Sequence, residues 1–225
     1  MIVVAPTGGL CNKLRVSFSY WEYAKSNNKN LTVIWETCEA CPGFFLDYFE
    51  PVNGITFLKE NSENLQIDYK GYSCEPNFNS NIKFLYTDLK LQSRIQDSIN
   101  EKLKVLGDFI AIQVRRTDHE EMAKSFNRFT TDEDFCKFID DNPNGNLFVT
   151  ADNKKSFDFF KERYSDRLKL EYPADDPTKH RHTSLEDSII DMFICTYATV
   201  FKQSGFSSFG DTIRQLRKSS SHLKF

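Results

Sequence analysis

The sequence predicts an α/β fold, and this prediction rests on its periodicity, its composition and its lack of repeats. Short apolar or β-branched runs alternate with segments of helical spacing, as in proteins whose sheets are covered by helices. The 225 residues are 40% hydrophobic and include 21 Phe, enough for a sizeable core. No segment recurs at a fixed period, so a repeat architecture is not indicated. We expect two Rossmann-like halves that join near residue 106.

The first half, residues 1–106, is expected to alternate strands with helices. Apolar and β-branched runs predict strands at residues 2–5, 31–35, 55–58 and 82–86, the last two from weaker patterns. Helical spacing predicts helices at residues 12–26 and 91–106. The polar stretch at residues 61–81, rich in Asn, Ser and Gly, favours loops.

The second half, residues 107–225, continues the alternation. The patterns predict strands at residues 109–114, 146–150 and 199–202, and helices at residues 153–164, 184–197 and 207–218. A further helix is expected to begin after Thr130 or Thr131, either of which could cap it, and to run to about Ile139. Asp132 and Glu133 suit its first turn, because acidic side chains stabilise a helix N-terminus.

Charge and hydropathy bear on the class of protein. The formal net charge is −3, so the protein as a whole is not a nucleic-acid binder, and any anion must be held by a local basic site. No apolar run reaches 18 residues, so no transmembrane helix is expected. Residues 1–9 lack the basic start and long apolar stretch of a signal peptide. We therefore expect a cytoplasmic protein whose six cysteines are mostly reduced.

Two short patterns raise the question of metal or redox chemistry. Cys38-Glu-Ala-Cys41 is a single CxxC pair, whereas a zinc site needs further ligands and no second CxxC exists. A redox role for this pair stays open. Asp132-Glu-Asp134 has an acid-x-acid form that can hold a metal, but its place at a helix start favours capping. We therefore expect no metal and no cofactor.

The segment Ile110-Ala-Ile-Gln-Val-Arg-Arg-Thr-Asp118 is the most informative. A buried strand ends directly in two arginines, and ligands of doubly wound sheets bind at the carboxyl ends of strands. Two guanidinium groups at such a place suit bidentate contact with phosphate. The alternative is a structural ion pair, for example between Arg116 and Asp118.

Two further segments could approach an anion or a ligand. Phe201-Lys-Gln-Ser-Gly-Phe-Ser-Ser-Phe-Gly210 runs from a strand into a helix, whose first backbone N–H groups lack helical acceptors. Ser207 and Ser208 add hydroxyl donors there, although an ordinary serine cap has the same pattern. Gly8-Gly9-Leu10-Cys11-Asn12 links the first strand and helix without matching a dinucleotide or P-loop fingerprint.

Together these segments resemble the fucosyltransferase superfamily, which includes α1,6-, α1,2- and protein O-fucosyltransferases and the nodulation fucosyltransferases. The likeness is greatest to the α1,6 group, whose His-Val-Arg-Arg-Thr-Asp motif is matched here by Gln113-Val-Arg-Arg-Thr-Asp118. Its strand end, acidic helix and serine-rich segment correspond to residues 148–153, 184–192 and 204–209. The motifs agree in order and spacing over residues 109–216, whereas the first half matches only at residues 8–14 and 33–36.

The resemblance implies a GT-B-like fold with an acceptor-side first half and a GDP-sugar-binding second half. It implies inverting transfer of fucose from GDP-fucose to a glycan hydroxyl, without metal. The partners would be the nucleotide-sugar donor and the glycan acceptor, with no nucleic acid and no membrane span.

The family motifs also suggest a role for each matched residue. Arg115 would bind the donor β-phosphate with Arg116 in support, while the nearby donor contacts come from Gln113, Ser207, Ser208 and Phe209. Asp152 and Asp191 are candidates for the nucleoside side, and Asn12 would face the reacting centre from the first half. Cleavage of the sugar–phosphate bond builds negative charge on GDP, and each preorganised donor would stabilise it by ~2–4 kcal/mol.

The sequence departs from the family pattern at three places. Gln113 stands where the family often has His, and Cys11 stands where it usually has Gly. The family's lysine and glutamate after the arginine motif align with His119 and Ala123, so the general base is not assigned by the resemblance.

We favour Glu121 as the base over Glu120, with His119 as a helper or substitute. A glycosyltransferase that uses another nucleotide sugar is one alternative. A non-catalytic module that binds a nucleotide sugar or glycan is the other.

Overall fold

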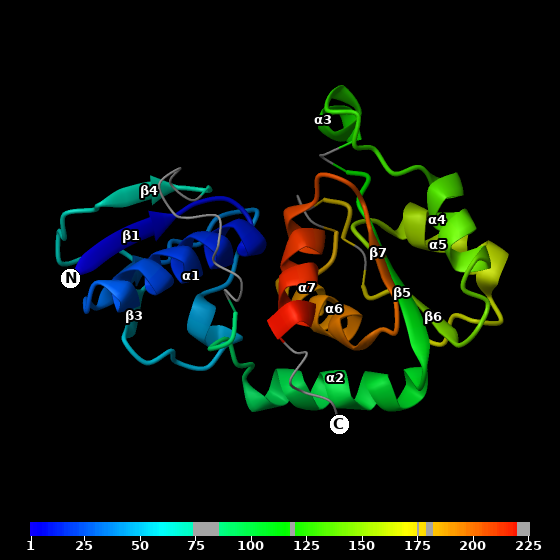
Figure 1. Ribbon diagram of the computed structural model, residues 1–225, viewed down its shortest axis with the longest axis horizontal. Helices are drawn as coiled ribbons and strands as arrows, with labels where there is room; N and C mark the ends of the chain where they lie inside the picture. Colours follow the sequence, from blue (N-terminus) through cyan, green and yellow to red (C-terminus); the bar gives the residue numbers. More distant parts are fainter. Residues whose placement is uncertain (74–85, 118–119, 175, 179–181, 220–225) are drawn as a thin grey trace. The chain divides into compact units, whose positions relative to one another are not determined.

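The computed structural model describes residues 1–73, 86–117, 120–174, 176–178 and 182–219. The chain divides into two compact units. The first unit comprises Met1–Ser93 and the end of the last helix from Gln215, and the second comprises Arg94–Arg214. Each unit contains a parallel sheet with helices, so the predicted α/β fold is confirmed (Figure 1).

The sheet of the first unit has four parallel strands in the order β3-β2-β1-β4. These strands are β1 (Ile2–Pro6), β2 (Leu31–Ile34), β3 (Ile55–Leu58) and β4 (Tyr69–Gly71). The helix α1 (Leu10–Ser26) follows β1 with Gly9 at its N-cap, and the short 3₁₀ helix η1 (Phe45–Asp47) follows β2. The first three predicted strands and the first helix are thus confirmed.

The expectation of loops throughout residues 61–81 is wrong in part, because β4 lies within this range and pairs with β1. Three residues are too few for a recognisable alternation, and the partner strand is more than 60 residues away in sequence. The strand expected at residues 82–86 lies almost wholly outside the described residues.

The sheet of the second unit has three parallel strands in the order β6-β5-β7. These are β5 (Phe109–Val114), β6 (Asn146–Ala151) and β7 (Phe201–Gln203). The helices are α2 (Ser93–Leu106), α3 (Glu120–Ser125), α4 (Asp132–Asp140), α5 (Lys154–Tyr164), α6 (Leu185–Tyr197) and α7 (Ser208–Ser219). All predicted elements of this half are present, and α3 is an addition that the sequence patterns did not reveal.

Local signals explain where these helices begin and end. The side chains of Thr131, Asn153 and Ser184 each accept a hydrogen bond from a backbone N–H in the first turn of α4, α5 and α6. Asp134 completes a capping box with Thr131, as the acidic pattern indicated. At the end of α2, Gly107 adopts a positive φ of 57° and its N–H donates to the Leu103 carbonyl, which terminates the helix.

Strand alternation divides the second sheet into two chemically different faces. Ile110, Ile112 and Val114 point to the face on which Phe135 of α4 and Phe160 of α5 complete a buried apolar core. The intervening Gln113 therefore points to the other face. The polar side chains at the ends of the strands are thus placed on a rigid apolar base.

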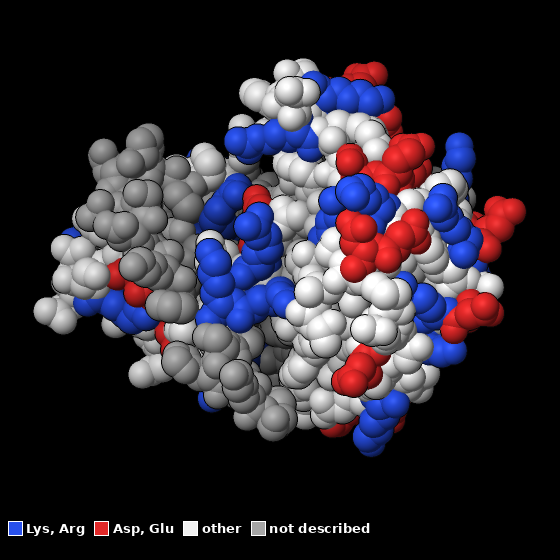
Figure 2. All heavy atoms as spheres, turned by 45° about the vertical axis from the view of Figure 1, so that its right-hand side comes forward, with Lys and Arg blue, Asp and Glu red and all other residues white. Residues whose placement is uncertain are grey.

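Charged side chains of both signs lie next to one another over the right-hand part of the face shown in Figure 2. On the second unit, ion pairs join Lys154 to Asp158 within α5 and Arg163 of α5 to Asp140 of α4. Both pairs are about half exposed, so each contributes little to stability.

Candidate functional site

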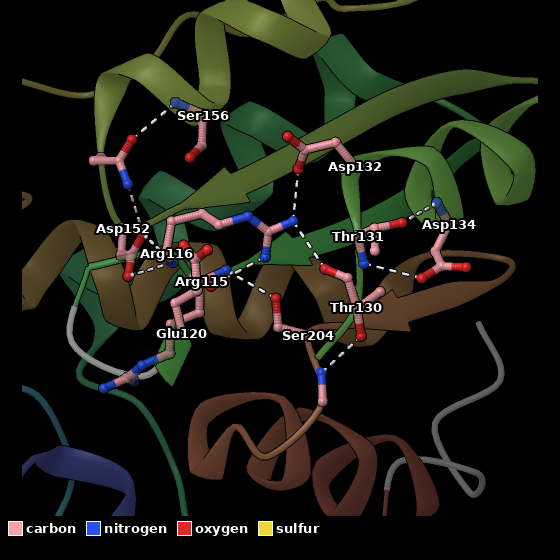
Figure 3. Close-up of polar contacts among 12 residues, drawn as sticks. Arg115, Arg116, Glu120, Thr130, Thr131, Asp132, Asp134, Asp152, Ser156 and Ser204 are labelled. Atoms are coloured by element: carbon pink, nitrogen blue, oxygen red, sulfur yellow. Dashed lines mark hydrogen bonds and ion pairs between the residues drawn. The ribbon is translucent and has the colours of Figure 1, made fainter. Parts of the chain in front are cut away.

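Three parallel strands of the second unit end at one edge of the sheet, and the predicted motifs meet there. Arg115 and Arg116 follow β5, Asp152 follows β6, and Ser204 follows β7 (Figure 3). Ligands of open α/β sheets bind outside this edge, because the strand carboxyl ends and the following helix N-termini converge on it. The edge is therefore the candidate site.

Arg115 is anchored through its backbone to β7. Its N–H donates to the Ser204 hydroxyl at 2.9 Å, and the Ser204 N–H donates to the Gln113 carbonyl at 2.8 Å. Ser204 is buried, so this connection is shielded from water. The arginine motif and the serine segment, 89 residues apart in sequence, are thus held together by two hydrogen bonds.

Arg116 is held through its side chain. The guanidinium donates to the Asp132 carboxylate at 2.6 Å and to the Thr130 carbonyl at 2.9 Å (Figure 3). It also lies over the ring of Phe129, with 4.8 Å between the guanidinium carbon and the ring centroid. Only 12% of the Arg116 side chain is exposed, and its ion pair with Asp132 therefore has a structural role.

Asp152 holds the loop that carries the arginines. Its two carboxylate oxygens accept from the Arg116 N–H at 3.0 and 3.1 Å, and one of them accepts from the Thr117 N–H at 3.0 Å. The Thr117 hydroxyl and the Asn153 amide donate to the same carboxylate. These bonds fix the direction in which the chain leaves β5.

The segment after β7 is fixed to the arginine motif through Thr130. The Gly205 N–H donates to the Thr130 hydroxyl at 2.9 Å, while the Thr130 carbonyl accepts from Arg116. A Cβ on Gly205 would overlap the Arg128 carbonyl oxygen, so only glycine fits there. The next residue, Phe206, is held at a φ of 60°, a conformation that costs energy outside glycine.

Helix α7 begins next to this strained residue. Ser207 is fully buried, and its hydroxyl accepts from the Gly210 N–H at 3.2 Å, so it acts as the N-cap. Ser208 and Phe209 are half-buried residues of the first turn. Their N–H groups belong to the set that has no acceptor within a helix, and a helix N-terminus favours anions.

A buried polar cluster lies on the face of the sheet opposite the apolar core. Thr150 pairs with Gln113 in register between β6 and β5, and its side chain is hydrogen-bonded to the Asp191 carboxyl of α6. Burial raises the pKa of Asp191 to about 7, against the opposing effects of the Lys102 charge and the Thr150 hydrogen bond. The Gln113 side-chain oxygen is buried and has no hydrogen-bond partner among the described residues. Such a group is costly unless a ligand or water reaches it.

The candidate bases lie on and before α3. Glu121 is exposed. The carboxylate of Glu120 accepts a hydrogen bond from the Lys124 ammonium at 2.6 Å, and this contact lowers the pKa of Glu120. Ala123, at the position of the family's glutamate, is buried. His119 lies outside the described residues.

Asn12 belongs to the first unit, where its side-chain oxygen accepts from Arg15 at 2.9 Å. It lies in the first turn of α1, beside the Gly8–Gly9 turn. Asn12 thus lies shortly after the carboxyl end of β1, and its role at the reacting centre stays a prediction.

Sequence reasoning assigned no site role to Ser204 or Thr150, and it considered Thr130 only as a possible helix cap. The contacts of Ser204 with Arg115 and of Thr130 with Gly205 join residues that are 89 and 75 positions apart, for which a single sequence has no signal. Two hints were present, because Thr150 is the last residue of the strand predicted at 146–150 and Ser204 lies two residues after the strand predicted at 199–202.

Solved structures share this fold over nearly their whole length. The NodZ α-1,6-fucosyltransferase soaked with GDP-fucose matches with a TM-score of 0.65 and 15% identity, covering 96% of this chain and 92% of that one. NodZ from Bradyrhizobium matches with a TM-score of 0.67 and 14% identity over 95% and 91% of the two chains. POFUT1 in complex with GDP matches with a TM-score of 0.66 and 10% identity over 98% and 96%.

The chain shares the fold of these solved fucosyltransferases. The resemblance inferred from the sequence is therefore confirmed at the level of the fold, which is GT-B-like. No protein-family model matches the sequence, and no curated protein matches it.

In the described residues no helix is both long and apolar enough to cross a membrane.

Proposed function

We propose that the protein is a glycosyltransferase that transfers L-fucose from GDP-fucose to a hydroxyl of a glycan acceptor, with inversion and without a metal ion. The observation that carries this proposal is the joining of Arg115 to Ser204 beside the start of α7. Arg115 and the first turn of α7 thus lie at one sheet edge, where a guanidinium and helix N–H groups would suit a phosphate, in a fold shared with solved fucosyltransferases.

The phosphate side of the donor would be bound by Arg115 and the first turn of α7. Departure of GDP from fucose leaves negative charge on the β-phosphate, and preorganised donors stabilise this charge. Arg116 supports the site from behind, because its guanidinium is already bound to Asp132 and the Thr130 carbonyl. Ser207 contributes by fixing the first turn, in which Ser208 then faces the phosphate.

The nucleoside side would be read by Asp191 and Gln113. An ionised Asp191 could accept from donor N–H groups of a purine edge, and the unpartnered oxygen of Gln113 could accept from a sugar hydroxyl. Phe209 would pack against the nucleoside from α7. Asp152 is a weaker candidate for nucleoside binding, because both its carboxylate oxygens already accept hydrogen bonds from the loop after β5.

The acceptor hydroxyl needs a base on the side opposite the departing GDP. Glu121 is the carboxylate on α3 that the ion pair to Lys124 leaves unengaged, so we retain it as the base, with His119 as its helper. Asn12 would act at the reacting centre from the first unit. No cofactor is required by this scheme.

A thermal-shift experiment in EDTA tests the donor. GDP and GDP-fucose should raise the melting temperature, while UDP, ADP and their sugars at equal concentration should not. Stabilisation by UDP-sugars alone, or only after Mn²⁺ is added, would contradict the proposal.

A non-catalytic module is the second candidate, and Ala123 favours it because a buried methyl group replaces the family's carboxylate. Hydrolysis of GDP-fucose without acceptor separates the two functions. A transferase should release GDP slowly into water, whereas a binding module should be stabilised by GDP-fucose and release none.

A further inference from the structure

The CxxC pair of the first unit forms a closed turn. The Cys38 N–H donates to the Cys41 carbonyl at 3.1 Å, and the Cys41 N–H donates to the Cys38 carbonyl at 2.9 Å, so the two residues form an isolated antiparallel bridge. The Cα atoms of such a hydrogen-bonded pair lie about 5.5 Å apart. This separation is within the range of about 4.4–6.8 Å that a disulfide spans. The backbone thus already holds the pair at bonding separation.

The two thiols differ in their surroundings. Cys38 is exposed and its thiol donates to the Gly8 carbonyl at 3.6 Å, whereas Cys41 is buried and its thiol donates to the Gly43 carbonyl at 4.0 Å. Burial raises the pKa of the Cys41 thiol to about 11, although the Lys13 charge partly opposes this. Cys38 is therefore the thiol that a reagent in solution meets first.

The residues around the turn are anchored. Trp35 donates from its ring N–H to the Gly43 carbonyl at 3.0 Å, and Lys13 of α1 donates to the Glu36 carbonyl. The Lys13 ammonium also lies 5.2 Å from the centroid of the Trp35 ring. The turn is thus fastened on both sides, while the Cys38 thiol reaches the loop between β1 and α1.

We propose that Cys38 and Cys41 form a reversible intramolecular disulfide by exchange with a low-molecular-weight disulfide such as oxidised glutathione. The Cys38 thiolate attacks one sulfur of the oxidant, which forms a mixed disulfide and releases one glutathione thiolate. Cys41 then loses its proton and attacks the Cys38 sulfur, which forms the internal bond and releases the second glutathione. Two cysteine thiols are oxidised and one glutathione disulfide is reduced.

The bond has a structural consequence for the neighbouring loop. In the disulfide, the Cys38 sulfur no longer carries the proton that it donates to Gly8. Gly8 has a positive φ of 79° and belongs to the turn that leads into Asn12. Oxidation therefore loosens the loop at the start of α1.

Mass spectrometry after incubation with oxidised glutathione tests the proposal. The native protein should lose the mass of two hydrogen atoms without retaining glutathione, its peptides should link Cys38 to Cys41, and dithiothreitol should reverse both changes. Cys41→Ser should trap one glutathione on Cys38, whereas Cys38→Ser should stay unmodified. Cys74→Ser is the control and should behave as the native protein does.

A stable glutathione adduct on the native protein, a link to another cysteine, or modification of Cys41 in Cys38→Ser would overturn the proposal. Amide hydrogen exchange gives a second readout, which should be faster at Gly8–Leu10 after oxidation and unchanged in Cys38→Ser. Equal exchange in both states would overturn the coupling to the loop. None of these measurements depends on transferase activity.

Discussion

Asp191 is expected to make the protein less stable as the pH rises. Its carboxyl is buried against Thr150, and burial raises its pKa from the ordinary value of 3.8 to about 7. Between these two values the native state binds more protons than the unfolded state, so the free energy of unfolding falls with increasing pH. The contribution is fully present below the unfolded pKa and is lost as the pH passes the native one.

The magnitude follows from the two pKa values. At about 1.4 kcal/mol per pH unit, the step from 3.8 to about 7 corresponds to on the order of 4 kcal/mol. Asparagine has the same shape and no charge at any pH, so Asp191→Asn removes this dependence. The variant should therefore gain stability relative to the native protein as the pH rises from 4.5 to 8, with the gain levelling off above about 7.

Urea unfolding of both proteins at half-unit pH intervals measures this difference. Asp158→Asn is the matched control, because Asp158 is an exposed partner of Lys154 on α5 and should give a nearly constant difference. The reasoning is refuted if the difference in free energy of unfolding between the native protein and Asp191→Asn does not change with pH across this range. It is also refuted if the difference has the opposite slope.

Three further outcomes are expected. Arg115→Lys should lower kcat/KM for GDP-fucose by more than tenfold at an unchanged melting temperature, since lysine keeps the charge but loses a planar fork worth ~2–4 kcal/mol in the transition state; a smaller loss contradicts its phosphate role. Glu121→Gln should lower turnover by roughly 10²-fold with the GDP dissociation constant unchanged, and normal turnover would place the base elsewhere. Gly205→Ala should lower the free energy of unfolding by about 1–3 kcal/mol, because its methyl group meets the Arg128 carbonyl. Gly9→Ala is the control, because its Cβ would be 3.6 Å from the nearest atom, and it should change the free energy of unfolding little. Equal losses of stability in the two variants would refute the claim that a Cβ at residue 205 overlaps the Arg128 carbonyl.

Local signals account for the parts of the fold that the sequence predicted well. The helices α4, α5 and α6 are capped by Thr131, Asn153 and Ser184, because a side chain can satisfy a backbone N–H three residues away without help from the rest of the chain. A strand such as β5 can be recognised in the sequence because all its residues are buried, which gives a nearly continuous apolar run. By contrast, β4 has only three residues and is stabilised by pairing with β1, and α3 has only six residues, so neither element has a recognisable periodicity in the sequence.

The candidate site was predictable in its chemistry and unpredictable in its connections. The two arginines at a strand end and the serines at a helix start could be recognised from residue type and order. That Asp132 and Thr130 bind the Arg116 guanidinium across the fold could not be recognised. The sequence suggested Asp118 as its partner, because neighbours in sequence are the partners that a sequence reveals.

The sequence by itself thus determined the α/β class, most elements and the residues able to bind an anion, because these depend on periodicity and on side-chain chemistry within a few positions. Only the tertiary structure decided that Ser204 holds Arg115, that Asp152 fixes the loop after β5, and that Asp191 is buried beneath Thr150. Hydrogen bonds and desolvation act through space, and the pairs they join here are separated by dozens of residues along the chain.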